Sequence, residues 1–427
     1  MAGITEYKFY TEHKQIETLP APETVYIPVI QHIGRPCDVI EVKEGDNVLM
    51  GQRLASAGAQ PFAPIHSSVS GQVIAIKPYP HPVLGTCKAI QIKNDLQDTI
   101  NANNHGRTEQ EVQKLGAKDI SDIVFNAGIV GMGGASFPTH IKLNPPRPVN
   151  TLIINIAECE PYLTGDSQLT IEKTGQIISA IGLISKCFPD LKKTVIAIED
   201  NKPLAIEKLE KACAGTPLTI SVLKAQYPQG GEKQLIKKIL NIEVPRAKLP
   251  FEVGVNVQNV STVFAVYEAL YSGKPLFERV VTVTGKCLAS PKNLLCRIGT
   301  PLKELIDFCG PLTNEPAKII VGGPMMGIAQ YTDRAPVIKS TTGVILLDKQ
   351  EARTLDETPC IRCGACVRAC PMGLMPCLLN QYSGKSIWQQ AKECGAMDCI
   401  ECGLCNYVCP ANRLLVQSIK RAKMESK

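Results

Sequence analysis

The stretch TLIINIAE (151–158) decides the fold class of the central part of this 427-residue chain. It is a near-continuous apolar run, as expected of a strand buried on both faces of a parallel sheet. A helical pattern follows at 167–188, and a second apolar strand, KTVIAIED, at 193–200. A helix at 205–215, a strand in PLTISVLKA and a helix in EKQLIKKILN continue the alternation. The pattern predicts an α/β domain with a mostly parallel sheet, which we bound at 115–275.

The N-terminal flank of this domain is rich in short β-segments. From about 24 to 95, β-branched residues alternate with Gly and Pro turns, which predicts a small all-β unit. VKEGDNVLMGQRLA and SGQVIAI look like the two halves of a barrel-sandwich hybrid, a fold whose carrier forms hold a cofactor on a hairpin Lys. The matching hairpin here is IHSSVSG, with His66, Ser67 and Ser68 and no Lys. We therefore expect a structural module over 1–100 and not a swinging-arm carrier.

The C-terminal flank returns to β-structure before a different kind of sequence begins. Residues 279–310 read as two strands, a Gly turn, another strand and a short helix. This order suggests a β-grasp unit, which we extend with a connector over 276–345. A polar stretch at 345–359 then leads into a cysteine-rich domain, which we bound at 350–427.

Composition excludes several classes of protein. The chain is 44% hydrophobic and 20% charged, an ordinary globular balance that excludes wholesale disorder. A net charge of +6 without a long basic run, and only 5% aromatic residues, argue against a nucleic-acid partner. No segment has the roughly 18–20 uninterrupted apolar residues of a spanning helix, and the N-terminus lacks an apolar signal core. We expect a soluble or peripheral protein that stays on the side where it is made.

Eight of the 18 cysteines lie in two repeated runs, CIRCGACVRACP (360–371) and CIECGLCNYVCP (399–410). The spacing C-x₂-C-x₂-C-x₃-C-P, present twice, is that of bacterial two-cluster ferredoxins. Zinc is the alternative, but a zinc site needs only two C-x₂-C pairs per ion. The regular triplet followed by Cys-Pro would then include cysteines that the zinc ions do not need. The scattered remaining cysteines are typical of a reducing compartment. The runs predict two [4Fe–4S] clusters.

The spacing also predicts which cysteines share a cluster. Three thiolates two residues apart can reach different irons of one cube, while the fourth points the other way and ligates the other cluster. The first cluster would take Cys360, Cys363, Cys366 and Cys409, and the second Cys370, Cys399, Cys402 and Cys405. Cys377 and Cys394 are interpreted as packed bystanders.

Clusters carry single electrons, so a two-electron donor needs a converter such as flavin. NAGIVGMGGASFPTHIKL (126–143) offers a glycine-rich loop whose bare N–H groups suit phosphate. It is not a strict G-x-G-x-x-G, because Ser136 takes the third position, and no G-K-[ST] follows. A structural turn is the alternative interpretation.

Two acidic segments follow predicted strands. NIAECEPY (155–162) carries Glu158 and Glu160 where parallel sheets place ligands, and YPQGGEKQL (227–235) carries Glu232. Burying such acids without a ribose hydroxyl or a cation would be costly. The alternative for each acid is a solvated loop charge.

These segments, with VGVNVQNVST (253–262), VGGPMMG (321–327) and the cysteine runs, resemble the C subunit of the Rnf-type ion-translocating oxidoreductase complex over residues 20–420. The resemblance implies a barrel-sandwich module, a domain similar to the NADH-binding flavoprotein subunit of respiratory complex I, a β-grasp segment and a helical two-cluster domain. It also implies FMN, with NADH as substrate. Residues implied in cofactor binding are Gly131, Gly133, Gly134, Ala135, Phe137, Lys142, Asn155, Glu160, Tyr227, Gly230, Glu232, Asn259 and Thr262.

In that complex I subunit the loop cradles FMN, and the resemblance implies that the Phe137 ring stacks on the nicotinamide nucleotide and that Lys142 is the basic residue of the loop. The chain departs from this pattern at Met132, Ser136 and Ala157, where the pattern has Arg, Gly and Asp.

The resemblance implies an electron-transfer subunit that passes electrons between NADH and ferredoxin. Integral membrane and iron–sulfur subunits of the same complex would be its partners, and it would lie peripherally on the cytoplasmic face of the cell membrane. A soluble flavin/iron–sulfur reductase, for example a cobalamin-reducing one, and a non-catalytic electron wire with a decayed nucleotide site remain alternatives.

Overall fold

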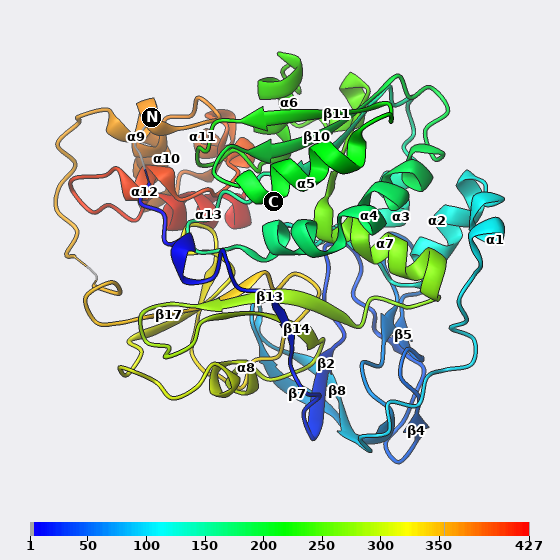
Figure 1. The fold of residues 1–427 in the computed structure, drawn as a ribbon. Helices are drawn as coiled ribbons and strands as arrows, with labels where there is room; N and C mark the ends of the chain where they lie inside the picture. Colours follow the sequence, from blue (N-terminus) through cyan, green and yellow to red (C-terminus); the bar gives the residue numbers. More distant parts are fainter. Residues whose placement is uncertain (1–3, 354, 427) are drawn as a thin grey trace.

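The α/β domain forms as the sequence predicts. The computed structural model, which describes residues 4–353 and 355–426, contains a parallel four-stranded sheet in the order β11-β10-β9-β12 (Figure 1). Its strands are β9 (Thr151–Ile156), β10 (Lys193–Glu199), β11 (Leu218–Leu223) and β12 (Val255–Asn259). The helices are α1 (Glu109–Gln113), α2 (Ala117–Asn126), α3 (Thr139–Leu143), α4 (Gly165–Ser185), α5 (Pro203–Cys213), α6 (Glu232–Leu240) and α7 (Val260–Ser272), and η2 (Pro250–Val253) precedes β12.

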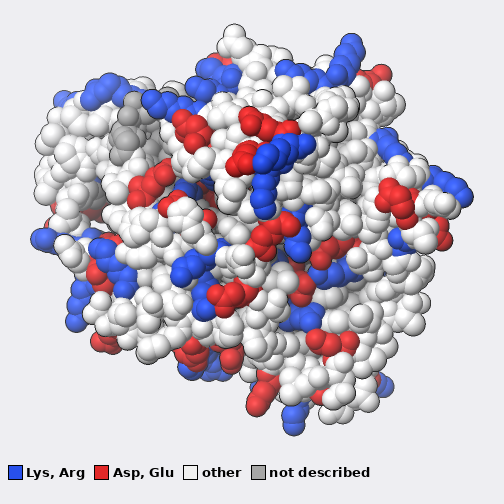
Figure 2. All heavy atoms as spheres, in the orientation of Figure 1, with Lys and Arg blue, Asp and Glu red and all other residues white. Residues whose placement is uncertain are grey.

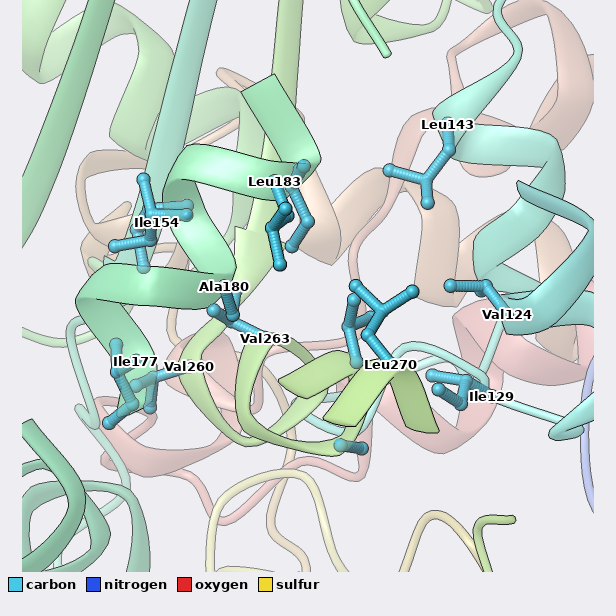
Figure 3. Close-up of a cluster of buried hydrophobic side chains, with 14 of the residues drawn as sticks. Val124, Ile129, Leu143, Ile154, Ile177, Ala180, Leu183, Val260, Val263 and Leu270 are labelled. Atoms are coloured by element: carbon cyan, nitrogen blue, oxygen red, sulfur yellow. The ribbon is translucent and has the colours of Figure 1, made fainter. Parts of the chain in front are cut away.

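The core of this domain anchors the glycine-rich loop. In β9 every residue except Asn155 is buried, as its apolar sequence predicts. Figure 3 shows Ile154 of β9 facing α4 and α7, with the cluster continuing to Ile129 and Leu143. Full burial of side chains of this size contributes about 1.5–3 kcal/mol each. Because Ile129 precedes the loop and Leu143 ends the helix after it, both flanks of the loop are fixed in the core.

The N-terminal module consists of two small antiparallel sheets, β2-β8-β7-β4 and β3-β5-β6. Its strands are β2 (Thr24–Pro28), β3 (Val39–Ile40), β4 (Asn47–Val48), β5 (Arg53–Ser56), β6 (Ile65–His66), β7 (Gly71–His81) and β8 (Gly85–Asn94). The hairpin that would carry a cofactor Lys in carrier domains is turned inward: His66 is buried, and the Ser68 hydroxyl donates to the Ile298 carbonyl at 2.6 Å. This burial agrees with the predicted structural role.

A six-stranded mixed sheet, in the order β1-β14-β13-β17-β15-β16, lies beside both domains. Its elements are β1 (Ile16–Thr18), β13 (Glu278–Thr284), β14 (Lys292–Arg297), α8 (Leu302–Phe308), β15 (Lys318–Val321), β16 (Ile328–Gln330) and β17 (Gly343–Leu347). β1 pairs in parallel with β14, with Ile16 opposite Asn293, so this strand belongs to the six-stranded sheet and not to the N-terminal module; η1 (Lys8–Tyr10) precedes it. The sequence pattern did not indicate that pairing.

The cysteine-rich domain is helical. It contains α9 (Ala365–Ala369), α10 (Pro376–Gly384), α11 (Trp388–Glu393), η3 (Ala396–Asp398), α12 (Leu404–Tyr407) and α13 (Leu415–Glu425). The tail helix α13 buries Leu415, Val416, Ile419 and Ala422 within this domain. On the molecular face in Figure 2, Lys and Arg are intermixed with Asp and Glu, as a small net charge without basic runs predicts.

Candidate functional site

The glycine-rich loop leaves the core through a narrow neck. The Gly131 N–H donates to the Phe137 carbonyl at 2.9 Å, and the Thr139 N–H donates to the Ile129 carbonyl at 3.0 Å. Phe137 is half-buried, so part of its ring surface remains accessible beside the loop. The neck holds the tip of the loop away from the sheet while fixing its base.

The tip consists of Gly133, Gly134 and Ala135, all exposed. A Cβ added to Gly134 would meet no atom within 4 Å, whereas one added to Gly133 would lie 2.6 Å from Nδ2 of Asn259. The tip is therefore closed on one side and open on the other, as a cradle for a planar anionic cofactor requires. Ser136 has φ +52°, the left-handed conformation that favours glycine, and among the described residues its buried Oγ has no hydrogen-bond partner.

Two asparagines follow adjacent strands in register and organise the loops around the tip. Asn155 of β9 lies opposite Asn259 of β12. The Asn155 amide donates to the Gly230 carbonyl at 2.9 Å, which ties the second loop to the strand end. Asn259 caps α7, and the neighbouring Thr262 hydroxyl accepts the Met132 N–H at 2.8 Å. Thr262 thus holds the glycine-rich loop directly, and Asn259 lies beside Gly133 while it caps the helix that carries Thr262.

Lys142 and Glu232 form an ion pair. Lys142 Nζ lies 2.5 Å from Glu232 Oε1 and 2.6 Å from the Val257 carbonyl. Their side chains are 22% and 42% exposed, so the pair contributes at most about 1 kcal/mol. In this arrangement much of the Lys142 charge is balanced by Glu232, and less is left for a phosphate.

The acids after β9 are held by backbone donors. Glu160 accepts the N–H groups of residues 325–326 at 3.1 and 2.9 Å, and burial raises its pKa to about 7. Burial and, second, the neighbouring Asp166 raise the pKa of Glu158 to about 6. Lys8 Nζ donates to the carbonyls of Glu158 and Glu160 at 2.7 and 2.8 Å. These acids therefore lie inside a buried polar network and are not solvated loop charges.

Tyr227 connects this region to the cysteine-rich domain. Its hydroxyl donates to the Cys402 carbonyl at 2.7 Å. Tyr227, Cys402 and Leu404 form a buried cluster against which Cys159 packs. The second cysteine run thus lies directly against the loops that surround the glycine-rich tip.

A pocket opens inside the cysteine-rich domain. Cys370 of the first run lines it together with Cys399, Cys402 and Cys405 of the second. This is the set that the spacing predicts for the second cluster. Burial raises the pKa of Cys402 to about 11 and that of Cys405 to about 12, and binding a metal would require both thiols to lose their protons.

The first run has a different environment. Cys366 is buried in a cluster against which Cys409 packs, while Cys360 and Cys363 are exposed. Cys377, interpreted from the sequence as a bystander, lies against Cys366; burial and, second, this neighbour raise the pKa of the Cys366 thiol to about 11.

The donor chemistry fits iron–sulfur clusters. Within residues 4–353 and 355–426, no three His, Cys, Asp or Glu side chains gather around a point that could hold a single metal ion. In a cubane each thiolate binds a different iron, so its four sulfurs lie farther apart than the ligands of one ion. The all-cysteine set around the pocket, Cys370, Cys399, Cys402 and Cys405, fits such a cluster.

The sequence analysis missed four buried cations: Lys8, Lys202, Arg279 and Lys339. The only signal for Arg279 and Lys339 was a basic residue at the edge of an apolar stretch, in ERVVTV and APVIKS.

In the part of the chain that the structure describes, no helix combines the length and the apolar character needed to traverse a bilayer.

Comparison with family models divides the chain into four matching regions. Residues 2–97 match the RnfC barrel sandwich hybrid domain, and residues 124–268 match the Nuo51 FMN-binding domain. Residues 280–329 match the SLBB domain, and residues 359–413 match a 4Fe-4S dicluster domain. The predicted order of barrel-sandwich, flavin, β-grasp and two-cluster units is confirmed, as are FMN and 4Fe-4S clusters as cofactors.

The chain is also similar to proteins along nearly its whole length. It is 45% identical to the C subunit of the proton-translocating ferredoxin:NAD(+) oxidoreductase complex of Clostridium ljungdahlii, covering 98% of this chain and 92% of the relative. It is 43% identical to the C subunit of the Na(+)-translocating ferredoxin:NAD(+) oxidoreductase complex of Acetobacterium woodii, covering 95% and 91%. Identity to the C subunit of the ion-translocating oxidoreductase complex of Rhodobacter capsulatus is 42%, covering 98% and 80%.

A solved NAD+-reducing [NiFe]-hydrogenase in the H2-reduced state shares the fold, with a TM-score of 0.53 and 17% identity over 77% of this chain and 68% of that one. Since the sequence identity to the C subunits is far higher and spans all four regions, the chain belongs to the family of C subunits of Rnf-type ion-translocating oxidoreductase complexes.

Proposed function

We propose that this chain passes electrons between NADH and ferredoxin within an ion-translocating membrane complex. The contact between Tyr227 and Cys402 supports this function most strongly, because it joins the glycine-rich loop region to the second cysteine run. Ion translocation itself belongs to the whole complex, and the chain would be a peripheral subunit on the cytoplasmic membrane face, held there by integral membrane partners.

Each part of the site has a role in this proposal. FMN, when bound, supplies the conversion between hydride transfer and single-electron transfer. The tip formed by Gly133, Gly134 and Ala135 binds its phosphate side through backbone N–H groups, Gly131 fixes the base of the loop through its N–H bond to the Phe137 carbonyl, and Phe137 stacks against the nicotinamide nucleotide.

The remaining residues orient these parts. Asn155 and Gly230 hold the second loop beside the strand end, and Tyr227 holds it against the cysteine-rich domain. Lys142 and Glu232 present polar groups at the rim, and Glu160 ties the segment after β9 to residues 325–326.

The order of electron transfer follows from burial. The cluster held by Cys370, Cys399, Cys402 and Cys405 would exchange electrons with the flavin, because its loop packs against Tyr227. The cluster held by Cys360, Cys363, Cys366 and Cys409 would exchange electrons with a partner, because Cys360 and Cys363 are exposed.

Anaerobic stopped-flow mixing of the purified chain with NADH tests the proposal. We expect bound flavin to be reduced first, followed by bleaching of cluster absorbance. Flavin that stays oxidised at saturating NADH would favour the electron-wire alternative. Purification from membranes tests the assembly: integral membrane subunits should co-purify, and their absence would favour a soluble reductase.

A further inference from the structure

Two buried cations lie beneath the glycine-rich loop. Arg279 on β13 is 3% exposed, and Lys339, which precedes β17, is 1% exposed. Within the described ranges, neither forms an ion pair with a carboxylate. Burial lowers the pKa of Lys339 to about 8 and that of Arg279 to about 10, which reflects the cost of holding these charges away from water.

The hydrogen bonds of both cations converge on the loop. Lys339 Nζ donates to the carbonyls of Gly128 and Pro64, each at 2.7 Å. The Arg279 guanidinium donates to the Met132 carbonyl at 3.3 Å and to the Lys339 carbonyl. The two cations therefore connect the N-terminal module and the β13 sheet to both ends of the segment 128–132.

The Arg279 contact fixes the direction of a peptide group. In a trans peptide the carbonyl of one residue and the N–H of the next point in opposite directions. With the Met132 carbonyl turned toward Arg279, the Gly133 N–H points away from it, toward the exposed tip. Among the described residues the Gly133 N–H has no acceptor, and the preceding Met132 N–H is already held by Thr262. The loop thus presents a free donor.

Neighbouring carboxylates offset less of the positive charge of Arg279 and Lys339 than of Lys142. Lys142 is paired with Glu232 at 2.5 Å. The carboxylate that acts on Arg279 is Asp166, whose two oxygens accept hydrogen bonds from Asn259 and Ser261 at 2.6 and 2.5 Å.

The groups that act on or face Lys339 are Cys37, His32 and His66. None of them carries a negative charge near neutral pH, because burial raises the pKa of the Cys37 thiol to about 11.

We propose that Arg279 and Lys339 are positioning residues for the flavin nucleotide: Arg279 holds the Gly133 N–H toward the cofactor, Lys339 anchors the start of the loop at Gly128, and both add positive charge near the phosphate. This proposal rests on the proposed function, because it assumes that the loop binds FMN. In this proposal the β13 sheet and the N-terminal module both support the loop that binds the cofactor.

The test compares FMN with riboflavin, which lacks the phosphate, on the flavin-stripped, cluster-containing full chain. Arg279→Met and Lys339→Met should each weaken FMN binding about tenfold or more, the range of a charge-assisted hydrogen bond, and riboflavin binding much less. Arg279→Lys and Lys339→Arg, which keep the charge, should recover most of the FMN affinity. Arg297→Met and Lys274→Met are matched controls, because these cations are paired with acids elsewhere in the same region. The controls should bind both ligands like the parent.

The outcomes separate the two proposals. If the parent chain binds neither FMN nor riboflavin, the proposed function fails, and this inference with it. If the parent binds FMN but the Met variants lose FMN and riboflavin equally, or lose neither, the function stands and the role of the two cations is overturned. Iron content and thermal unfolding identify a misfolded Met variant, and the charge-conserving variants then decide: equal losses of FMN and riboflavin in them also overturn the proposal.

Discussion

The two cysteine runs share one spacing but have different surroundings. In the second run Cys402 and Cys405 are buried, and the Cys402 carbonyl accepts the Tyr227 hydroxyl. In the first run Cys360 and Cys363 are exposed, and Ile361 between them is 67% exposed. Solvent exposure and hydrogen bonding around the sulfurs tune cluster potentials. A repeated motif can therefore provide one inner and one outer electron carrier within a single domain.

The largest expected effect tests whether the runs exchange their fourth ligands. Cys370→Ser should abolish the cluster built on the second run, since Cys370 lines the same pocket as Cys399, Cys402 and Cys405. Cys409→Ser should abolish the cluster built on the first. Each variant should retain about half of the parent iron, with one cluster signal left in the EPR spectrum. Loss of the cluster in the mutated residue's own run would contradict the exchange.

The second prediction tests whether flavin binding can be lost while the clusters of both cysteine runs are kept. Gly133→Val should abolish flavin binding and leave both clusters in place, because even a Cβ at this position would lie 2.6 Å from Asn259 Nδ2. Flavin content and iron content, measured on the same sample, check this. Gly175→Ala is the control, since an added Cβ there meets nothing within 4 Å. Retained flavin in the Val variant would place the cofactor elsewhere.

A smaller difference should appear in cluster lifetime. The cluster of the first run should lose iron several-fold faster than that of the second when the chain is exposed to air and a chelator, because solvent reaches Cys360 and Cys363. Time-resolved EPR of the Cys370→Ser and Cys409→Ser variants follows each cluster alone. Equal rates would show that the difference in burial has no chemical consequence.

The smallest expected effect concerns the contact between the domains. Tyr227→Phe removes the hydroxyl that donates to the Cys402 carbonyl, and should cost about 1 kcal/mol of stability. It should shift the reduction potential of the second-run cluster and leave that of the first unchanged. Tyr382→Phe, in the same cysteine-rich domain, is the control. A redox titration in which both potentials move together would argue against a local effect.

Much of the fold could be predicted because its signals are local. The apolar run at 151–158 becomes β9, and the alternating pattern after it yields α4, β10, α5, β11 and α6 close to the expected positions. The structural role of the N-terminal module was predicted from the missing Lys of carrier domains, whereas the burial of its hairpin was not predicted. β1 was not predicted, because three residues carry too little pattern and their partner β14 lies far along the chain.

The candidate site divides in the same way. The cysteine runs, the glycine-rich loop and the acids after β9 could be identified from the sequence alone, because each of them is a motif of residues that are close together in the chain. Only the tertiary structure decided that Glu232 pairs with Lys142, that Tyr227 meets Cys402, and that Arg279 and Lys339 lie beneath the loop. Such contacts join residues that are far apart in the chain, and their energies depend on burial, which no local pattern specifies.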